Sequence, residues 1–113
     1  MITADEIRQL ALSLPGVEER ETWGEATFRV RDKIFFMLSP GEQEASLRTS
    51  LEEQDVLVNS HSESFSPAHY TGRYGWVHVE LSTVDPDLMC ELVIKTWRRT
   101  APRRLVAEYD AVN

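Results

Sequence analysis

Residues 70–82 constrain the fold of this chain more than any other segment. Residues 71–75 combine glycines with polar side chains and are typical of a turn, and residues 76–81 then alternate strictly in polarity. Alternation of this kind predicts a β-strand with two different faces. The apolar face must meet a core and carries Val77, Val79 and Leu81. The other face carries Trp76, His78 and Glu80, and we expect any function to lie near it.

Capping residues predict the helices. Thr3 and Glu6 form a capping box ahead of an apolar stripe, and Pro15-Gly16 ends this first helix. The stripe comprises Ile7, Leu10, Ala11 and Leu14. Ser50, with Glu53 three residues later, predicts a short helix through about Leu57.

A longer helix begins at Asp85-Pro86, because aspartate is a good N-cap and proline suits the first helical position. Its apolar side comprises Leu88, Met89, Leu92, Val93, Thr96 and Trp97. Ala101-Pro102 ends it, and residues 103–109 form a last helix with Leu105, Val106 and Tyr109 turned inward.

Three further strands are predicted at residues 26–30, 34–38 and 45–49. The short turns between them, at 31–33 and 39–43, imply an antiparallel meander. The continuous apolar run at 34–38 is typical of a strand covered on both faces.

The remaining segments are predicted as loops. Residues 17–25 are acidic and read as a solvated loop, and residues 59–69 read as a loop with a short extended piece at Phe65. Pro67 is expected to start a helical turn through Tyr70. The order of elements predicts an α+β fold, with helices packed on one face of an antiparallel sheet. The length fits a single domain over residues 1–113.

Composition restricts the partners and the location. The net charge of −7 argues against avid, sequence-blind DNA binding, which depends on Lys and Arg neutralising phosphates. The late helices nevertheless carry a basic run: Lys95, Arg98, Arg99, Arg103 and Arg104. The helix dipole accounts for two of these bases, and the surplus could face an anionic partner. The lone Cys90, the lack of a signal-peptide pattern and the lack of a long apolar run predict a cytoplasmic protein without membrane contact. The sequence leaves the oligomeric state open, with a monomer favoured.

The sheet face turned away from the helices is the strongest candidate site. Alternation places Arg29, Arg48, Trp76, His78 and Glu80 on it, joined by one of Phe35 or Phe36. Arginines beside exposed rings are typical of surfaces that stack single-stranded bases, at about 1–3 kcal/mol per base. A structural alternative is that Trp76 packs under its neighbours and Arg29 pairs with Glu80 across the strands.

The sequence predicts neither catalysis nor a metal or cofactor site. The histidines, His61, His69 and His78, lack a tight metal-ligand spacing, and Cys90 stands alone. The pairs Ser66/His69 and His78/Glu80 lack a third, orienting group. We therefore expect a binding protein that is not an enzyme.

Four segments together resemble the MmcQ/YjbR family of small bacterial proteins. They are Trp23-Gly24, FRVRDKIFFML at 28–38, SPAHYTGRYGWVHVEL at 66–81 and RRTAPRRLV at 98–106. The resemblance implies a frataxin-type, CyaY-like α+β fold and DNA binding through a double wing of β-hairpins, with no catalytic residues. The wings would fall on turns 31–33 and 39–43. The second turn carries Glu42 and is followed by Glu44, which would repel phosphate.

Three functions stay open at this point. The first is nucleic-acid binding, through Arg29, Arg31, Lys33, Arg48, Arg73 and Trp76. The second is binding of a small anionic metabolite on the same face, with Arg73 and Arg48 as charge partners. The third is a protein-interaction module that uses the acidic residues 18–25. An exposed Trp76 over a concave basic surface would favour either ligand function, and a sealed Trp76 would favour neither.

Overall fold

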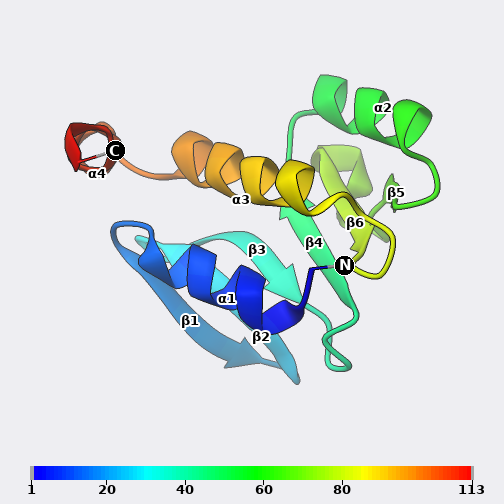
Figure 1. Cartoon of the computed structure of the whole chain (residues 1–113), viewed down its shortest axis with the longest axis horizontal. Helices are drawn as coiled ribbons and strands as arrows, with labels where there is room; N and C mark the ends of the chain where they lie inside the picture. The colour runs from blue at the N-terminus through cyan, green and yellow to red at the C-terminus, as the bar shows by residue number, and fades with distance from the viewer. Residues whose placement is uncertain (1, 113) are drawn as a thin grey trace.

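A six-stranded antiparallel sheet organises the computed structural model, which describes residues 2–112. Its strands are β1 (Val17–Thr22), β2 (Glu25–Val30), β3 (Lys33–Leu38), β4 (Glu44–Arg48), β5 (Phe65–Pro67) and β6 (Trp76–Glu80). They lie in the order β1-β2-β3-β4-β6-β5 (Figure 1). The helices are α1 (Ala4–Ser13), α2 (Leu51–Ser60), the 3₁₀ helix η1 (Thr71–Tyr74), α3 (Pro86–Thr100) and α4 (Arg103–Val112). The predicted α+β architecture is confirmed.

The helices begin where the caps predict. The Thr3 hydroxyl accepts from the Glu6 amide while the Glu6 carboxylate accepts from the Thr3 amide, and Asp85 accepts from the Leu88 amide at the start of α3. Ser50 caps α2, which runs past Leu57, its predicted end. Each helix in residues 2–112 is too short or too polar to span a bilayer.

Helices α1 and α3 lie side by side across the sheet, and α2 packs against β5 and β6 (Figure 1). The apolar side chains of β2, β3, β4 and β6 meet α1 and α3 in one core. Its largest members are fully buried: Trp97, Phe28, Phe35 and Phe36. The predicted alternation of β6 is confirmed, because Val77 and Val79 are buried while the intervening side chains are only partly covered.

A β-bulge in β3 corrects one prediction. Phe28 pairs with Phe36 and Arg29 pairs with Ile34, so Phe35 is an extra residue on β3. A bulge interrupts the two-residue period of a strand. Both Phe35 and Phe36 are therefore buried, and the prediction that one of them joins the opposite face is wrong. The β3 residues on the face turned away from the helices are Ile34 and Met37, both half-buried.

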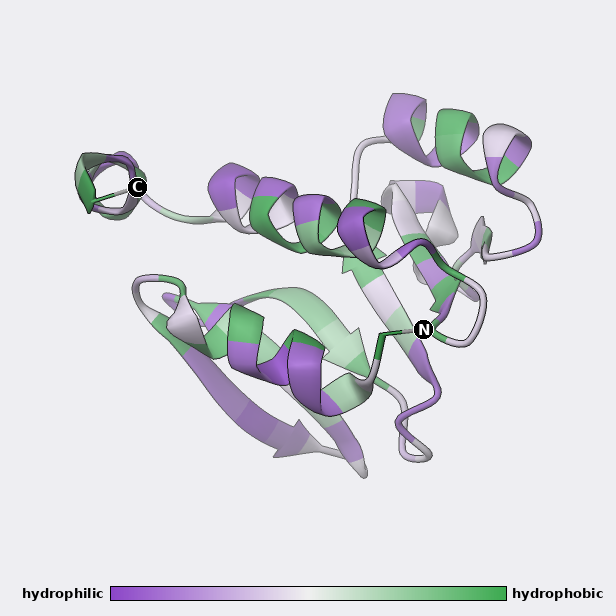
Figure 2. Ribbon diagram, viewed as in Figure 1, coloured by the Kyte–Doolittle hydropathy of each residue, from purple (hydrophilic) through white to green (hydrophobic). Residues whose placement is uncertain are grey.

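The acidic segment predicted as a loop is strand β1, at the edge of the sheet and paired with β2. Figure 2 shows why the prediction failed, since β1 is almost entirely hydrophilic while β3 is largely apolar. Its residues from Glu18 to Glu21 are exposed, so no apolar alternation marks the strand. Trp23 and Gly24 make the tight turn into β2, both with positive φ. Charges on an exposed edge also oppose pairing with other chains.

Residues 67–75 also differ from expectation. Pro67 ends β5, and the helical turn begins later, as η1. Gly75 then follows with φ of 101°, and a Cβ there would lie 2.1 Å from the Thr49 carbonyl oxygen. The Gly75 carbonyl accepts from both the amide and the hydroxyl of Thr49. Only glycine fits this close approach, which fixes where β6 begins beside β4.

Trp97 connects the ends of the chain. Its indole N–H donates to the Pro15 carbonyl at 3.1 Å, and its ring meets the Tyr109 ring edge to face, with centroids 5.3 Å apart. Through this side chain α3 holds both the α1–β1 connection and α4. The predicted inward position of Tyr109 is confirmed.

Alanine substitutions at three glycines should separate two sources of strain. Gly75→Ala combines a positive φ with a backbone clash and should lower the free energy of unfolding by about 3 kcal/mol or more. Gly24→Ala has the positive φ but open space and should cost about 1 kcal/mol. Gly41→Ala has neither and should stay within about 0.5 kcal/mol of the parent protein. Urea unfolding measures all three, and equal losses at Gly75 and Gly24 would contradict the clash.

Trp97→Phe should lower the free energy of unfolding by about 2–3 kcal/mol, because it leaves a cavity and an unpaired Pro15 carbonyl. Trp23→Phe is the matched control, since Trp23 is 96% exposed, and its effect should stay within about 0.5 kcal/mol. Denaturation followed by circular dichroism measures both. Similar effects at the two positions would refute the role given to Trp97.

Candidate functional site

The sheet face turned away from the core is here called the open face. Its side chains are Thr27, Arg29, Ile34, Met37, Glu44, Ser46, Arg48, Trp76, His78 and Glu80. The pairing of β4 with β6 sets its rows. Arg48 lies opposite Trp76 at one end, Ser46 opposite His78 in the middle, and Glu44 opposite Glu80 at the other end. The predicted sharing of one face by Arg29, Arg48, Trp76, His78 and Glu80 follows from this register.

The predicted nucleic-acid residues gather around one end of the sheet, here called the basic end. It comprises Arg31, Lys33, Arg48 and Arg73, all exposed, with the rings of Tyr70, Tyr74 and Trp76. Arg31 and Asp32 form the predicted tight turn with positive φ at both residues. Lys33 pairs with Val30, so it stands on the core side of that turn. Arg73 precedes β6 in η1, and its guanidinium lies 4.8 Å from the centre of the Tyr74 ring.

Arg29 lies near this end of the sheet, but its guanidinium is directed away from the basic end. It lies on β2, where its guanidinium donates to the hydroxyls of Thr27 and Thr22. The alternative pairing of Arg29 with Glu80 is wrong, because β3 and β4 separate their strands. Arg29 is half-buried, and its hydrogen bonds hold the guanidinium along the sheet surface.

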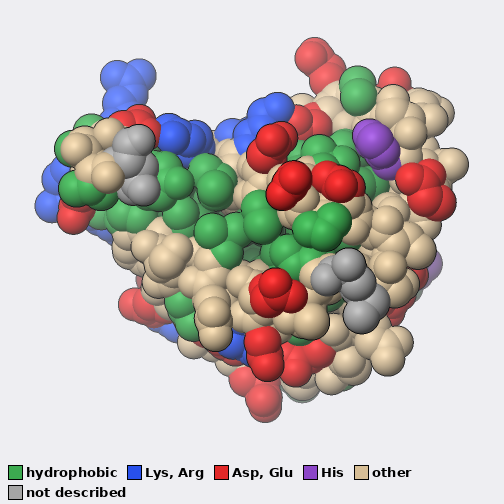
Figure 3. Space-filling model, in the orientation of Figure 1, with side chains coloured by type: hydrophobic (Ala, Val, Ile, Leu, Met, Phe, Trp, Pro, Cys, Tyr) green, Lys and Arg blue, Asp and Glu red, His purple; other side chains and the backbone are tan. Residues whose placement is uncertain are grey.

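Ion pairs involve only some of the basic side chains. Within residues 2–112, ion pairs engage Arg8, Arg20, Lys95 and Arg98. Within the same residues, the four basic side chains of the basic end have no carboxylate within ion-pair distance. The same holds for Arg29, Arg99, Arg103 and Arg104. Most basic side chains visible in Figure 3 lie over the end of α3 and over α4, which is a second basic surface.

Carboxylates dominate the opposite end of the sheet. Arg8 of α1 contacts three of them, Asp5, Glu19 and Glu42, and the hydrogen bond to Glu42 is the largest cause of the raised pKa of Arg8. Arg20 contacts Glu18 and Asp32, which lie at the other end, because Val17 pairs with Val30 beside the 31–33 turn. Of the four glutamates in residues 18–25, Glu18 and Glu19 make ion pairs within residues 2–112, whereas Glu21 and Glu25 do not.

A hollow of about 470 Å³ lies against the open face. Trp76, His78, Ile34 and Met37 come from the sheet, and His69, Tyr70 and Thr71 come from the segment before β6. Trp76 is half-buried, so it is neither sealed nor free, and it forms a wall of this hollow. Tyr70 and Tyr74 are 83% and 64% exposed, unusually high for tyrosines.

Three potential metal ligands meet at the acidic end of the open face. His78 Nε2 lies 2.9 Å from Glu44 Oε2 and 3.5 Å from Glu80 Oε1. All the ligand atoms lie within 4.8 Å of one another, and the side chains are half-exposed. The sequence showed Glu80 beside His78 but missed Glu44, because α2, β5 and η1 separate β4 from β6 along the chain.

The two turns expected to act as wings lie at opposite ends of β3. A strand of this length spans about 20 Å, so residues 31–33 and 39–43 cannot stand side by side. The turn that neighbours 39–43 is Trp23-Gly24, because Ala26 pairs with Leu38. Glutamates flank both turns at that end: Glu25, Glu42 and Glu44.

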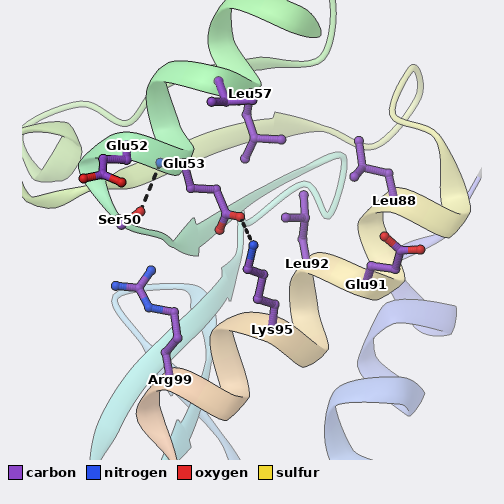
Figure 4. A pocket seen from close by; sticks show the side chains of 10 residues that line it. Ser50, Glu52, Glu53, Leu57, Leu88, Glu91, Leu92, Lys95 and Arg99 are labelled. Carbon is purple, nitrogen blue, oxygen red and sulfur yellow. Dashed lines mark hydrogen bonds and ion pairs between the residues drawn. The ribbon is translucent and has the colours of Figure 1, made fainter.

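A second, larger hollow of about 590 Å³ lies between α2 and α3 (Figure 4). Leu57, Leu88 and Leu92 line it, and an ion pair between Glu53 and Lys95 crosses it. Its charged side chains include both signs and come from both helices.

Cys90 and His69 were the other candidates for chemistry. Burial, followed by the charges of Asp87 and Glu6, raises the pKa of the Cys90 thiol, so Cys90 is a poor nucleophile. The His69 ring packs against Tyr70, with centroids 4.2 Å apart. These contacts are structural in character.

Comparison with known proteins identifies the family. The chain resembles the Deinococcus radiodurans protein DR2400, whose crystal structure contains a DUF419 domain, with a TM-score of 0.78 and 24% sequence identity over 86% of this chain and 77% of that one. This likeness establishes the fold. No curated protein matches the chain. The YjbR family model matches residues 12–99, which cover β1 to α3 and the whole open face, so the chain belongs to the YjbR family.

Proposed function

We propose that the protein binds nucleic acid at the basic end, with a preference for single strands. The observation that supports this most is that Arg48 and Arg73, both exposed and outside ion pairs, lie beside the exposed Tyr74 ring and the half-buried Trp76 ring. Arginine and lysine side chains can neutralise phosphates while aromatic rings stack on nucleobases. This combination is found on surfaces that bind single-stranded nucleic acid. The proposal assigns binding and no catalytic step.

Single strands suit this surface better than a duplex. Stacking requires the face of a base, which a duplex hides within its own stack. A double-wing grip on duplex DNA would need its two turns to act together, whereas they lie at opposite ends of β3. Glu42 and Glu44 near the second turn also disfavour phosphate there.

The charge balance sets the strength of binding. The log of the affinity falls with the log of the salt concentration by about 0.7 for each phosphate that a basic side chain neutralises on a single strand. If Arg31, Lys33, Arg48 and Arg73 each contact one phosphate, the slope is roughly −3. The net charge of −7 opposes any polyanion at longer range. We therefore expect binding that is clear at low salt and weak at physiological salt.

Removing two arginines of the basic end should abolish most of this binding. Arg48→Gln combined with Arg73→Gln should weaken binding of a fluorescein-labelled oligothymidine by about tenfold or more at low salt, because two phosphate contacts are lost. Arg103→Gln combined with Arg104→Gln is the matched control, since it removes the same charge from exposed, unpaired residues of α4. It should change affinity by less than about twofold. Fluorescence anisotropy measures both, and equal losses would contradict a localised site.

Tyr74→Ala tests stacking separately from charge. Tyr74 is 64% exposed, so its removal should leave folding unchanged. It should weaken single-strand binding by about 1–3 kcal/mol, or roughly 5–150-fold, without changing the salt slope. An unchanged affinity would remove the reason for preferring single strands.

A second candidate ligand is a small anionic molecule in the hollow beside Trp76. The volume of about 470 Å³ lies in the range of small-molecule sites, but the lining of the hollow includes Glu25 and neither Arg48 nor Arg73, so the charge partners expected for an anion stand outside it. Thermal-shift measurements with nucleoside monophosphates and organic acids test it. Stabilisation by one of these, with no oligothymidine binding at low salt, would replace the nucleic-acid proposal.

A further inference from the structure

We infer that Glu44, His78 and Glu80 form a binding site for a divalent transition-metal cation, of which Zn²⁺ is the reference case. The site lies at the acidic end of the open face, where Glu44 pairs with Glu80 across β4 and β6. The basic end lies at the other end of the same two strands, so this site is independent of the proposed nucleic-acid site.

The spacing of the three side chains suits a single ion. Bonds of about 2.0–2.2 Å to nitrogen and oxygen place neighbouring ligand atoms roughly 3–3.5 Å apart. The distances from His78 Nε2 to the two carboxylate oxygens, 2.9 and 3.5 Å, match that spacing. The Glu44 and Glu80 oxygens are within 4.8 Å, and these half-exposed side chains can close the difference by small rotations.

Electrostatics also favour a cation here. Two carboxylates directly opposite one another on neighbouring strands repel. Within residues 2–112, no Lys or Arg lies within ion-pair distance of Glu44 or Glu80. A single imidazole N–H can donate fully to only one of them. A divalent ion would contact both carboxylates and the ring nitrogen at once.

The sheet holds the Cα atoms of the three residues in place before any ion binds. Glu44 begins β4, and His78 and Glu80 stand two residues apart on β6, so ladder hydrogen bonds fix all three positions. Ligands carried on sheet strands lose little freedom when an ion binds, which favours affinity. Between 57% and 68% of each side chain is covered, and the exposed remainder leaves a path from solvent.

The ligand set indicates the class of ion. One imidazole nitrogen with two carboxylates suits Zn²⁺, Co²⁺ or Mn²⁺, whereas Mg²⁺ prefers oxygen ligands alone. Three protein ligands leave further coordination positions open. His78 also lines the 470 Å³ hollow, so an ion held here would stand at its border.

Calorimetric titration of the whole chain with ZnCl₂, after treatment with a chelator, tests the site. We expect one equivalent of Zn²⁺ to bind with micromolar affinity or better, and Co²⁺ to give visible absorption bands that Zn²⁺ abolishes. His78→Gln, Glu44→Gln and Glu80→Gln should each weaken Zn²⁺ binding by about tenfold or more. His61→Gln and Glu63→Gln are the matched controls, since both residues are exposed and lie outside the cluster, and they should bind as the parent protein does.

Thermal unfolding separates ion binding from a purely structural role. Without metal, Glu44→Gln should melt at the same or a higher temperature than the parent protein, because it removes one of two repelling charges. With Zn²⁺ in excess the order should reverse, since only the parent protein gains the full stabilisation of a bound ligand. Binding no tighter than millimolar, or an equal loss of affinity in the control variants, would overturn the inference.

Discussion

The antiparallel pairing of β4 with β6 is the constraint on which the rest of the molecule depends. The two strands are separated along the chain by α2, β5 and η1, and they meet at a backbone approach that only Gly75 permits. The Gln54 side-chain amide reinforces that approach by donating to the Gly72 and Trp76 carbonyls at 2.6 and 2.8 Å. This pairing places an arginine opposite a tryptophan at one end of the open face and two glutamates opposite each other at the other end.

Burial on a single face of the sheet leaves the other face free to carry chemistry. The buried apolar side chains of β2, β3, β4 and β6 turn to α1 and α3, and the bulge at Phe35 adds a second phenylalanine of β3 to that side. The open face consequently keeps aromatic, basic and carboxylate groups. Its two ends differ in charge, and they are therefore suited to ligands of opposite sign.

Local signals predicted most of the fold. The Thr3 and Asp85 caps, the alternation of β6 and the tight turn at Arg31 all act within a few residues, and the structure confirms each of them. Strand β1 escaped prediction because its exposed edge position removes the apolar pattern that marks a strand. The bulge in β3 was not predicted either. Faces are assigned from the alternation of side chains along a strand, and an extra residue interrupts that alternation.

The candidate site was harder to predict, because local patterns do not show which strands are neighbours. Alternation correctly placed Arg48, Trp76 and His78 on one face, but it could not show which strands are neighbours. Glu44 therefore escaped notice, and Arg29 was paired with the distant Glu80. Sites that depend on pairing between strands remote in sequence need the topology before their residues can be grouped.

The central claim is that the open face binds nucleic acid at its basic end and a cation at its acidic end. The most direct test is a nitrogen-15 NMR titration with oligothymidine at low salt, followed by Zn²⁺. Oligothymidine should shift amide signals of the 31–33 turn, η1 and the Arg48–Trp76 row, and Zn²⁺ should then shift those around Glu44, His78 and Glu80. Oligothymidine shifts confined to Arg99, Arg103 and Arg104, or overlapping shifts from the two ligands, would contradict the account.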